Sequence, residues 1–309
     1  MGCAIVMREM AMGSVCVLAI LALVAIGPEG VAASADYARP DLLISTHELA
    51  NVLGDPTVKV LDARGPEDYA AGRIPGGISL PVEQTRYVER GIPGILAPIE
   101  DLEQLIGGLG IRPTDTMVVY GEVVGVRAAR LFWTLEVLGH TKLRVLNGGM
   151  SKWAKEGRPI SRGAPLLLPG RYAARADWTK YADAAYVLAR NGSPDVVLLD
   201  CRSRREWTGE VASKHVRRGG RIPGARNVDW ELNLTSEGGA QVLRSAQELT
   251  RLYADAGVGR DKEIVTYCRT GRRAAHTYLV LRLLGYPRIR VYDASMIEWG
   301  NRPELPIEK

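Results

Sequence analysis

The segment Ile264–Ala275 reads IVTYCRTGRRAA and joins a short apolar run to a stretch with helical spacing. The run Ile264–Tyr267 is typical of a buried strand. Apolar groups recur at helical spacing over Arg272–Leu284, and Gly285 follows as a stop signal. Cys268 therefore lies in a predicted strand-to-helix turn. Because sites in open α/β folds lie at the carboxyl ends of strands, this turn is a candidate site.

The surroundings of Cys268 favour its thiolate, which is the reactive form of cysteine. The turn directs peptide N–H groups inward and adds the positive end of a helix. Cations are unfavourable at a helix N-terminus, so several arginines there indicate that an anion normally occupies the turn. A lone cysteine is more often a small buried residue, but these neighbours reverse that interpretation. We predict Cys268 as the nucleophile, in an anion-binding loop of Arg269, Thr270, Gly271, Arg272 and Arg273.

The length of the loop discriminates between two chemistries. A phosphatase of the Cys-x5-Arg kind needs an arginine six positions after the cysteine, and here that position is Ala274. The Cys-x4-Arg loop that ends at Arg273 is one residue shorter. A smaller loop suits a single sulfur atom better than a tetrahedral phosphate, so sulfur chemistry is favoured over phosphoryl transfer.

An internal repeat indicates two copies of one unit. A shift of 146 residues aligns a long stretch without a gap, placing Arg127 on Arg273 and Trp153 on Trp299. The sequence GRIPG also occurs twice, at 72–76 and 220–224. In this alignment Glu122 takes the place of Cys268, and Val123, Val124 and Val126 replace Arg269, Thr270 and Arg272. The first unit is therefore predicted to be catalytically inactive and to form a wall of the active site in the second unit.

Strands and helices alternate in both units, which predicts an α/β fold. Strand-like runs occupy Val196–Asp200 and Arg290–Tyr292, and capping-box patterns at Ser45 and Ser245 open predicted helices. We expect two domains, each a parallel sheet with helices on both faces. The predicted first domain is 41–160 and the second 178–309, with a linker at 161–177 that is rich in Gly and Pro. The run Leu166–Leu168 inside it predicts a linker that packs on the domains.

Composition sets limits on partners and cofactors. The chain has 309 residues and a formal net charge of +5, with a pI of about 9.0. Because no block of five or six cations occurs, the charge does not argue for nucleic acid and fits small anionic substrates. Four scattered histidines and no CxxC predict that there is no metal site, and no cofactor is expected.

Residues 1–35 are typical of a targeting segment. An uncharged apolar stretch at 14–26 ends at Gly27-Pro28, and Ala33-Ser34-Ala35 supplies small residues for cleavage. We expect a signal peptide cleaved near Ala35 and a periplasmic or secreted protein; an N-terminal membrane anchor is the alternative. Cleavage would leave only Cys201 and Cys268, too few for a disulfide scaffold.

The Cys268 loop, the block Leu199–Arg202, the GRIPG repeats and Tyr292–Trp299 resemble the tandem rhodanese family. Within it the likeness is greatest to bacterial thiosulfate sulfurtransferases, and it covers nearly the whole chain after residue 40. The resemblance implies that Cys268 takes the outer sulfur of thiosulfate, holds it as a persulfide and passes it to cyanide or a thiol. It also implies that Arg269 and Arg272 hold the donor and that Arg273 braces the loop. From the targeting segment we expect a membrane to be involved only if residues 1–35 are retained.

Two other functions remain open. One is transfer of sulfur from 3-mercaptopyruvate. Relatives that use this donor tend to carry Cys-Gly-Ser/Thr-Gly loops, so the arginine at position 269 favours thiosulfate as the donor. The other is a non-catalytic binding or sulfur-carrier module, which the complete loop disfavours.

Several residues have predicted supporting roles. Asp200 either accepts hydrogen bonds from the loop or, as we prefer, pairs with Arg202. Glu206 stands where some rhodaneses have a substrate-contacting arginine, and Arg205 is the expected substitute. Cys201 either resolves the persulfide into a disulfide or simply packs beside the sheet, as we prefer.

Overall fold

A computed structural model describes residues 1–2, 36–163 and 165–309. The predicted targeting segment therefore lies outside the described residues, apart from its first two. No helix in the described part of the chain has the length and apolar character needed to cross a membrane.

The first half of the chain folds into a five-stranded sheet in the order β1-β7-β6-β2-β3, and every pairing is parallel. Its strands are β1 (Leu43–Ile44), β2 (Val58–Asp62), β3 (Ile78–Ser79), β6 (Thr116–Tyr120) and β7 (Leu143–Leu146). The helices are α2 (Thr46–Val52), α3 (Pro66–Ala71), α4 (Ile99–Gly108), α5 (Val126–Val137) and α6 (Gly149–Lys155), and a hairpin joins β4 (Arg86–Glu89) to β5 (Ile92–Leu96).

The second half repeats this plan in a parallel sheet of order β10-β9-β13-β14-β8. Its strands are β8 (Tyr181–Ala182), β9 (Val196–Asp200), β10 (Arg226–Asn227), β13 (Glu263–Tyr267) and β14 (Ile289–Tyr292). The helices are α7 (Ala184–Arg190), α8 (Arg204–Trp207), α9 (Ala246–Asp255), α10 (Arg272–Leu283) and α11 (Ser295–Trp299), with a hairpin of β11 (Leu234–Glu237) and β12 (Ala240–Leu243). The predicted α/β class with two parallel sheets is confirmed, as are the capping boxes at Ser45 and Ser245.

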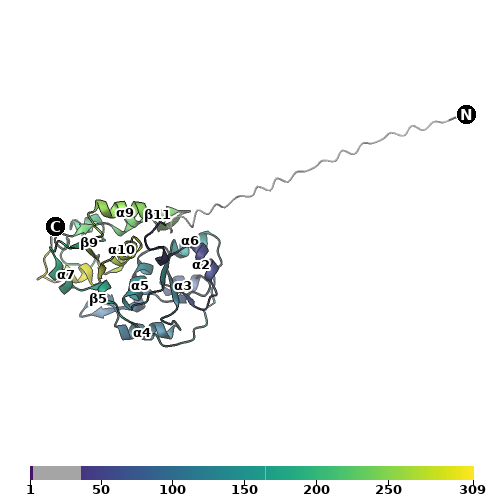
Figure 1. Ribbon diagram of the computed structural model, residues 1–309, viewed down its shortest axis with the longest axis horizontal. Coiled ribbons are helices and arrows are strands. Elements are labelled where there is room, and N and C mark those ends of the chain that lie inside the picture. The colour runs from purple at the N-terminus through teal and green to yellow at the C-terminus, as the bar shows by residue number, and fades with distance from the viewer. Residues whose placement is uncertain (3–35, 164) are drawn as a thin grey trace.

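The two halves share one hydrophobic core along α5 and α10, which pack against each other at the centre of the molecule (Figure 1). Both helices are buried along most of their length because each also covers its own sheet. A polar cluster fixes their register: Glu136 on α5 accepts hydrogen bonds from Tyr278 at 2.6 Å and from Arg282 at 2.9 Å. The halves are therefore joined by packing and not only by the chain connection.

Segments outside the sheets also connect the halves. The amide of Arg39 donates to the carbonyl of Leu283 at 3.0 Å, so the chain lies against the second half before it enters the first sheet. In the connection over 161–177, Tyr172 is buried and Leu167 packs against the core, whereas Leu166 and Leu168 are exposed.

Candidate active site

Cys268 follows the central strand β13 and precedes α10, in the turn where the strand-to-helix pattern placed it. The whole residue is only 1% exposed, yet it borders a surface cavity of about 330 Å³. The other residues that line this cavity come from three segments and are mostly charged: Val126, Glu206, Lys214, Arg269, Thr270, Arg272 and Arg273. The structure thus brings Cys268 and its loop cations together around one hollow.

Ser295 holds the loop in position. Its Oγ accepts hydrogen bonds from the amides of Cys268 at 3.1 Å and Gly271 at 3.3 Å, and it donates to the carbonyl of Tyr292 at 2.7 Å. Ser295 has a left-handed backbone with φ of +54°, which costs energy for a residue other than glycine. Within the described part of the chain, the amides of Arg269, Thr270, Arg272 and Arg273 donate to no acceptor. These amides are available to an anion in the turn.

Replacing Ser295 by Ala should destabilise the protein and lower its activity. The change leaves the amides of Cys268 and Gly271 buried without an acceptor, which costs about 1–3 kcal/mol. Urea unfolding measures the loss of stability, and Ser151→Ala, in the corresponding helix of the first half, serves as the matched control. Equal unfolding midpoints for the two variants would show that Ser295 does not hold the loop. Ser295 lies in the motif Tyr292–Trp299, but no sequence pattern predicted its role, because that role depends on contacts across 24 and 27 residues.

The loop cations differ in whether a carboxylate already neutralises them. Arg273 forms a bidentate pair with Glu206 at 2.6 and 3.0 Å, and Arg272 pairs with Glu83 of the first half at 2.7 Å. No described carboxylate lies within 4.0 Å of the cationic groups of Arg269 or Lys214. The charge of Arg272 is therefore paired, whereas no described carboxylate pairs with the charges of Arg269 and Lys214 in the hollow.

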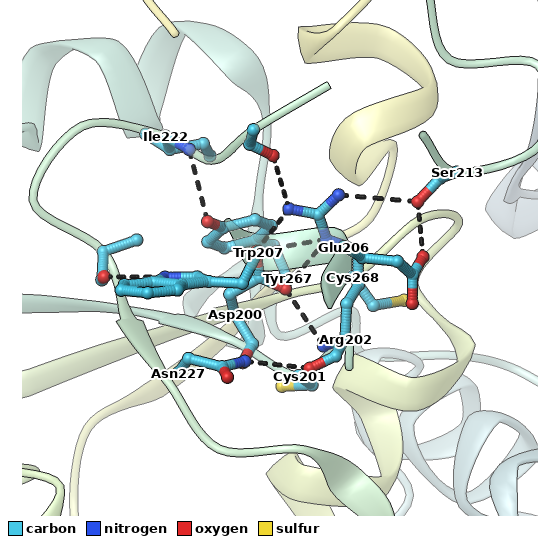
Figure 2. A network of polar contacts seen from close by, with 12 residues as sticks. Asp200, Cys201, Arg202, Glu206, Trp207, Ser213, Ile222, Asn227, Tyr267 and Cys268 are labelled. Carbon is cyan, nitrogen blue, oxygen red and sulfur yellow. Dashed lines mark hydrogen bonds and ion pairs between the residues drawn. The ribbon is translucent and has the colours of Figure 1, made fainter. Parts of the chain in front are cut away.

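Glu206 keeps its negative charge at neutral pH. Burial by itself raises the pKa of this carboxyl, but hydrogen bonds from Arg273 and Ser213 outweigh burial and lower the pKa to about 2. Figure 2 shows the chain of contacts that continues from Glu206 through Ser213 to Arg202. Glu206 thus offsets the charge of Arg273 and fixes its direction.

The predicted role of Arg205 is corrected by the structure. Neighbouring residues of a helix point about 100° apart, and in α8 it is Glu206 that faces the loop. Arg205 is two-thirds exposed and pairs with Glu210 at 2.9 Å, away from the cavity. Lys214, and not Arg205, lines the hollow. It lies in an irregular segment, where no periodicity could have indicated its direction.

Of the two roles predicted for Asp200, the structure shows the pairing with Arg202. Its carboxylate accepts a hydrogen bond from Nε of Arg202 at 2.9 Å and none from residues 268–273 (Figure 2). The first half has the same buried pair, Asp62 with Arg64 at 3.0 Å. Asp200 therefore supports the end of β9 and reaches the loop only through its neighbours.

The residue of the first half that corresponds to Cys268 is Gly121, not Glu122. The carbonyls of Gly121 and Cys268 accept equivalent hydrogen bonds, from the amides of Met150 and Met296 at 2.9 and 3.1 Å. Glu122 instead matches Arg269. The turn between strand and helix is one residue longer in the first half, so an alignment without gaps shifts the turn by one position. The first half still has no nucleophile at this place.

Cys201 fits the packing interpretation. It is fully buried, and burial raises the pKa of its thiol well above the ordinary value. Its sulfur donates to the carbonyl of Leu199 at 3.5 Å and is directed away from Cys268 in Figure 2. A thiol in this state is a poor nucleophile near neutral pH.

The first half contributes Arg86 to the loop. Nη2 of Arg86 donates to the carbonyl of Thr270 at 2.7 Å, and its Nε donates to Gly94 at 2.7 Å. Burial, together with the neighbouring Arg130 and Arg272, lowers the pKa of Arg86 to about 9. Sequence reasoning missed Arg86 because it comes from a hairpin 184 residues away.

Comparison with known proteins gives consistent matches over both halves. The family model described as a rhodanese-like domain matches residues 45–156 and 183–302. A thiosulfate sulfurtransferase of Azotobacter vinelandii is 37% identical over 88% of this chain and 99% of that protein. The sulfur carrier protein TtuD of Thermus thermophilus is 35% identical over 88% of this chain and 98% of that protein.

A solved structure shows the same fold. The crystal structure of an anaerobic ergothioneine biosynthesis enzyme from Chlorobium limicola superposes with a TM-score of 0.78 at 24% identity. The match covers 88% of this chain and 71% of that chain, and at this identity it bears on the fold alone.

Proposed function

Because the chain belongs to the rhodanese family and is a sulfurtransferase of that family, we propose that it moves sulfur from thiosulfate through a persulfide on Cys268. The observation that carries this proposal is the position of Cys268 in a strand-to-helix turn, beside a hollow lined by cations. Relatives named thiosulfate sulfurtransferase support the choice of donor, among them one of Pseudomonas aeruginosa that is 35% identical.

The reaction proceeds in two displacements. The Cys268 thiolate attacks the outer sulfur of thiosulfate, a new sulfur–sulfur bond forms, and the old one breaks with its electron pair leaving on sulfite. Cyanide or a thiol then attacks the terminal sulfur of the persulfide, which releases Cys268 as a thiolate. The free amides of the turn face the site of this negative charge and stabilise it.

Arg269 and Lys214 hold the donor in this mechanism. Both line the hollow, and neither is neutralised by a described carboxylate, so their charges act on the sulfonate oxygens of thiosulfate. Arg273 stays with Glu206 and shapes the loop. Arg86 positions the carbonyl of Thr270 from the opposite half.

Intact mass spectrometry after thiosulfate treatment tests the proposal. We expect an adduct of about 32 Da, one sulfur atom, that maps to Cys268 and disappears when cyanide is added. A phosphatase or a binding module acquires no such adduct. An unmodified Cys268 in protein that still releases sulfite would rule out the persulfide.

Replacing Lys214 by Met should weaken donor binding more than the chemical step. The change keeps the apolar stem and removes one charge from the hollow, so we expect KM for thiosulfate to rise about tenfold while kcat changes less. Steady-state kinetics at low salt measure both constants. Lys142→Met is the control, since Lys142 is exposed and lies outside the hollow. An unchanged KM would remove Lys214 from the donor site.

We also propose export of the protein, with cleavage near Ala35. The support is the pattern of residues 1–35 alone. N-terminal sequencing of protein from the periplasm or medium tests it, and an intact residue 1 on protein that remains with the membrane would favour the anchor.

A further inference from the structure

A second hollow lies at the end of the second sheet where its strands begin. Cys268 lies at the other end, where the strands finish. The second hollow has a volume of about 980 Å³ and includes Val196, the first residue of β9, whereas the Cys268 loop lies beyond the last residues of the strands. Its lining also includes Pro194, Gly224, Ala254 and Gly257. The two hollows are therefore separate, with the sheet between them.

The internal repeat provides a counterpart of this hollow in the first half. In the first half, Pro56, Val58, Gly76 and Gly110 correspond to Pro194, Val196, Gly224 and Gly257. There the irregular segment Pro165–Leu168, which we call the strap, lines the same hollow as these residues. A Cβ on Gly110 would stand 2.6 Å from the carbonyl oxygen of Leu168, so the strap backbone contacts the groove directly.

The strap follows a short bridge between Ser161 and Arg73 in the first half. The second half has the corresponding bridge, between Glu308 and Arg221, but no described segment lies over its groove. Among the described residues, only the groove of the first half is therefore lined by a proline- and leucine-rich strap.

Charged residues line both grooves, Lys59, Arg112 and Asp115 in the first and Arg226, Arg260, Asp261 and Lys262 in the second. Arg226 stands where the first half has Ile78, and Lys262 where it has Asp115. Arg260 also lines the second groove, with its guanidinium 5.6 Å from the ring of Tyr286. Lys262 pairs with Asp261 at 3.5 Å, but Arg226 and Arg260 pair with no described carboxylate. The second groove thus combines an apolar floor with two unpaired cations.

We propose that this groove binds an extended, leucine-containing and acidic segment of a partner protein. Burial of leucines on the floor stabilises the complex by about 25 cal/mol for each Å² removed from water, and carboxylates pair with Arg226 and Arg260. Because the groove and Cys268 are at opposite ends of the strands, the bound segment leaves the thiol accessible to the sulfur donor. The partner stays attached while sulfur is transferred.

A fluorescent peptide provides the probe. Its core is PLLLP, the sequence of 165–169 in this chain, with two aspartates added at each end. The probe stops there because Gly170 contacts Gly107, and the corresponding position of the second half is Ala254, whose Cβ leaves less room. Fluorescence anisotropy with the full-length protein measures binding, and a peptide with lysines in place of the aspartates tests the charge requirement.

We expect saturable binding to the wild type and about tenfold weaker binding to Ala254→Trp, which fills the groove from an exposed helical position. The double variant Arg226→Glu/Arg260→Glu should lose about as much affinity and should reverse the preference between the two peptides. Gln247→Trp, exposed on the same helix outside the groove, should bind like the wild type. Thiosulfate turnover should be the same in all four proteins.

Three results would overturn the proposal. They are an absence of saturable binding up to millimolar peptide, equal affinity of Ala254→Trp and the wild type, and stronger binding of the lysine peptide. Sedimentation of the protein without peptide tests whether a second copy of this chain occupies the groove instead. A dimer that dissociates in Ala254→Trp would show that it does.

Discussion

Cys268→Ser should lower kcat for sulfur transfer by at least about 10³-fold and abolish the persulfide adduct. The serine oxygen fits the turn that holds the sulfur, so the fold should remain intact. An alcohol is not ionised near neutral pH and does not form a stable bond to sulfane sulfur, so the first displacement fails. Side-by-side kinetics with thiosulfate and 3-mercaptopyruvate measure the effect and show which donor the wild type prefers.

Cys201→Ala is the matched control for this experiment. Cys201 is the other described cysteine, it is fully buried, and its thiol is hydrogen-bonded to Leu199. We expect the variant to keep the adduct on Cys268, most of the turnover and the same sensitivity to peroxide. Turnover by Cys268→Ser at the wild-type rate would refute the proposed mechanism, whereas a loss of peroxide protection in Cys201→Ala would restore the resolving role of Cys201.

Arg130→Met should destabilise the protein by about 3–5 kcal/mol, because it leaves the charge of Asp293 buried without its partner. Arg130 on α5 and Asp293 after β14 form an ion pair across the two halves, and both side chains are inaccessible to solvent. The other carboxylate oxygen of Asp293 accepts the amide of Leu96 at 2.7 Å. Denaturation by urea, followed by fluorescence, measures the free energy of unfolding.

The same substitution should lower kcat. A Cβ placed on Gly271 would contact Arg130 and Asp293 within 3 Å, so the ion pair forms the wall against which the loop rests. The matched control is Arg127→Met, since Arg127 lies one turn earlier and makes an exposed pair with Asp68 at 3.9 Å. Such pairs contribute about 0–1 kcal/mol. Equal stability of the two variants would show that the buried pair does not join the halves.

A double variant separates charge from packing. Arg130→Met/Asp293→Leu removes both charges, and replacing a buried ion pair by apolar groups restores much of the stability that a single change loses. Recovery should remain incomplete by about 1–3 kcal/mol, because the amide of Leu96 then has no acceptor. A double variant less stable than Arg130→Met would contradict this account.

Much of the fold could be predicted because its signals are local. The strand and helix around Cys268 follow from apolar spacing within a dozen residues, and the capping boxes need only a serine and a glutamate three residues apart. The repeat located the corresponding elements of the first half. It failed by one residue at Gly121, because the helices dominate an alignment without gaps and conceal an insertion in the turn.

The sequence by itself determined the fold class, the duplication and the position of Cys268 where a strand meets a helix. Only the tertiary structure decided which charges around that sulfur remain free. Glu206 and Glu83 neutralise Arg273 and Arg272 across 67 and 189 residues. Periodicity reports the direction of a side chain only within its own helix or strand. Ion pairs and hydrogen bonds between distant segments depend instead on distance in space, which is established when the two halves pack together.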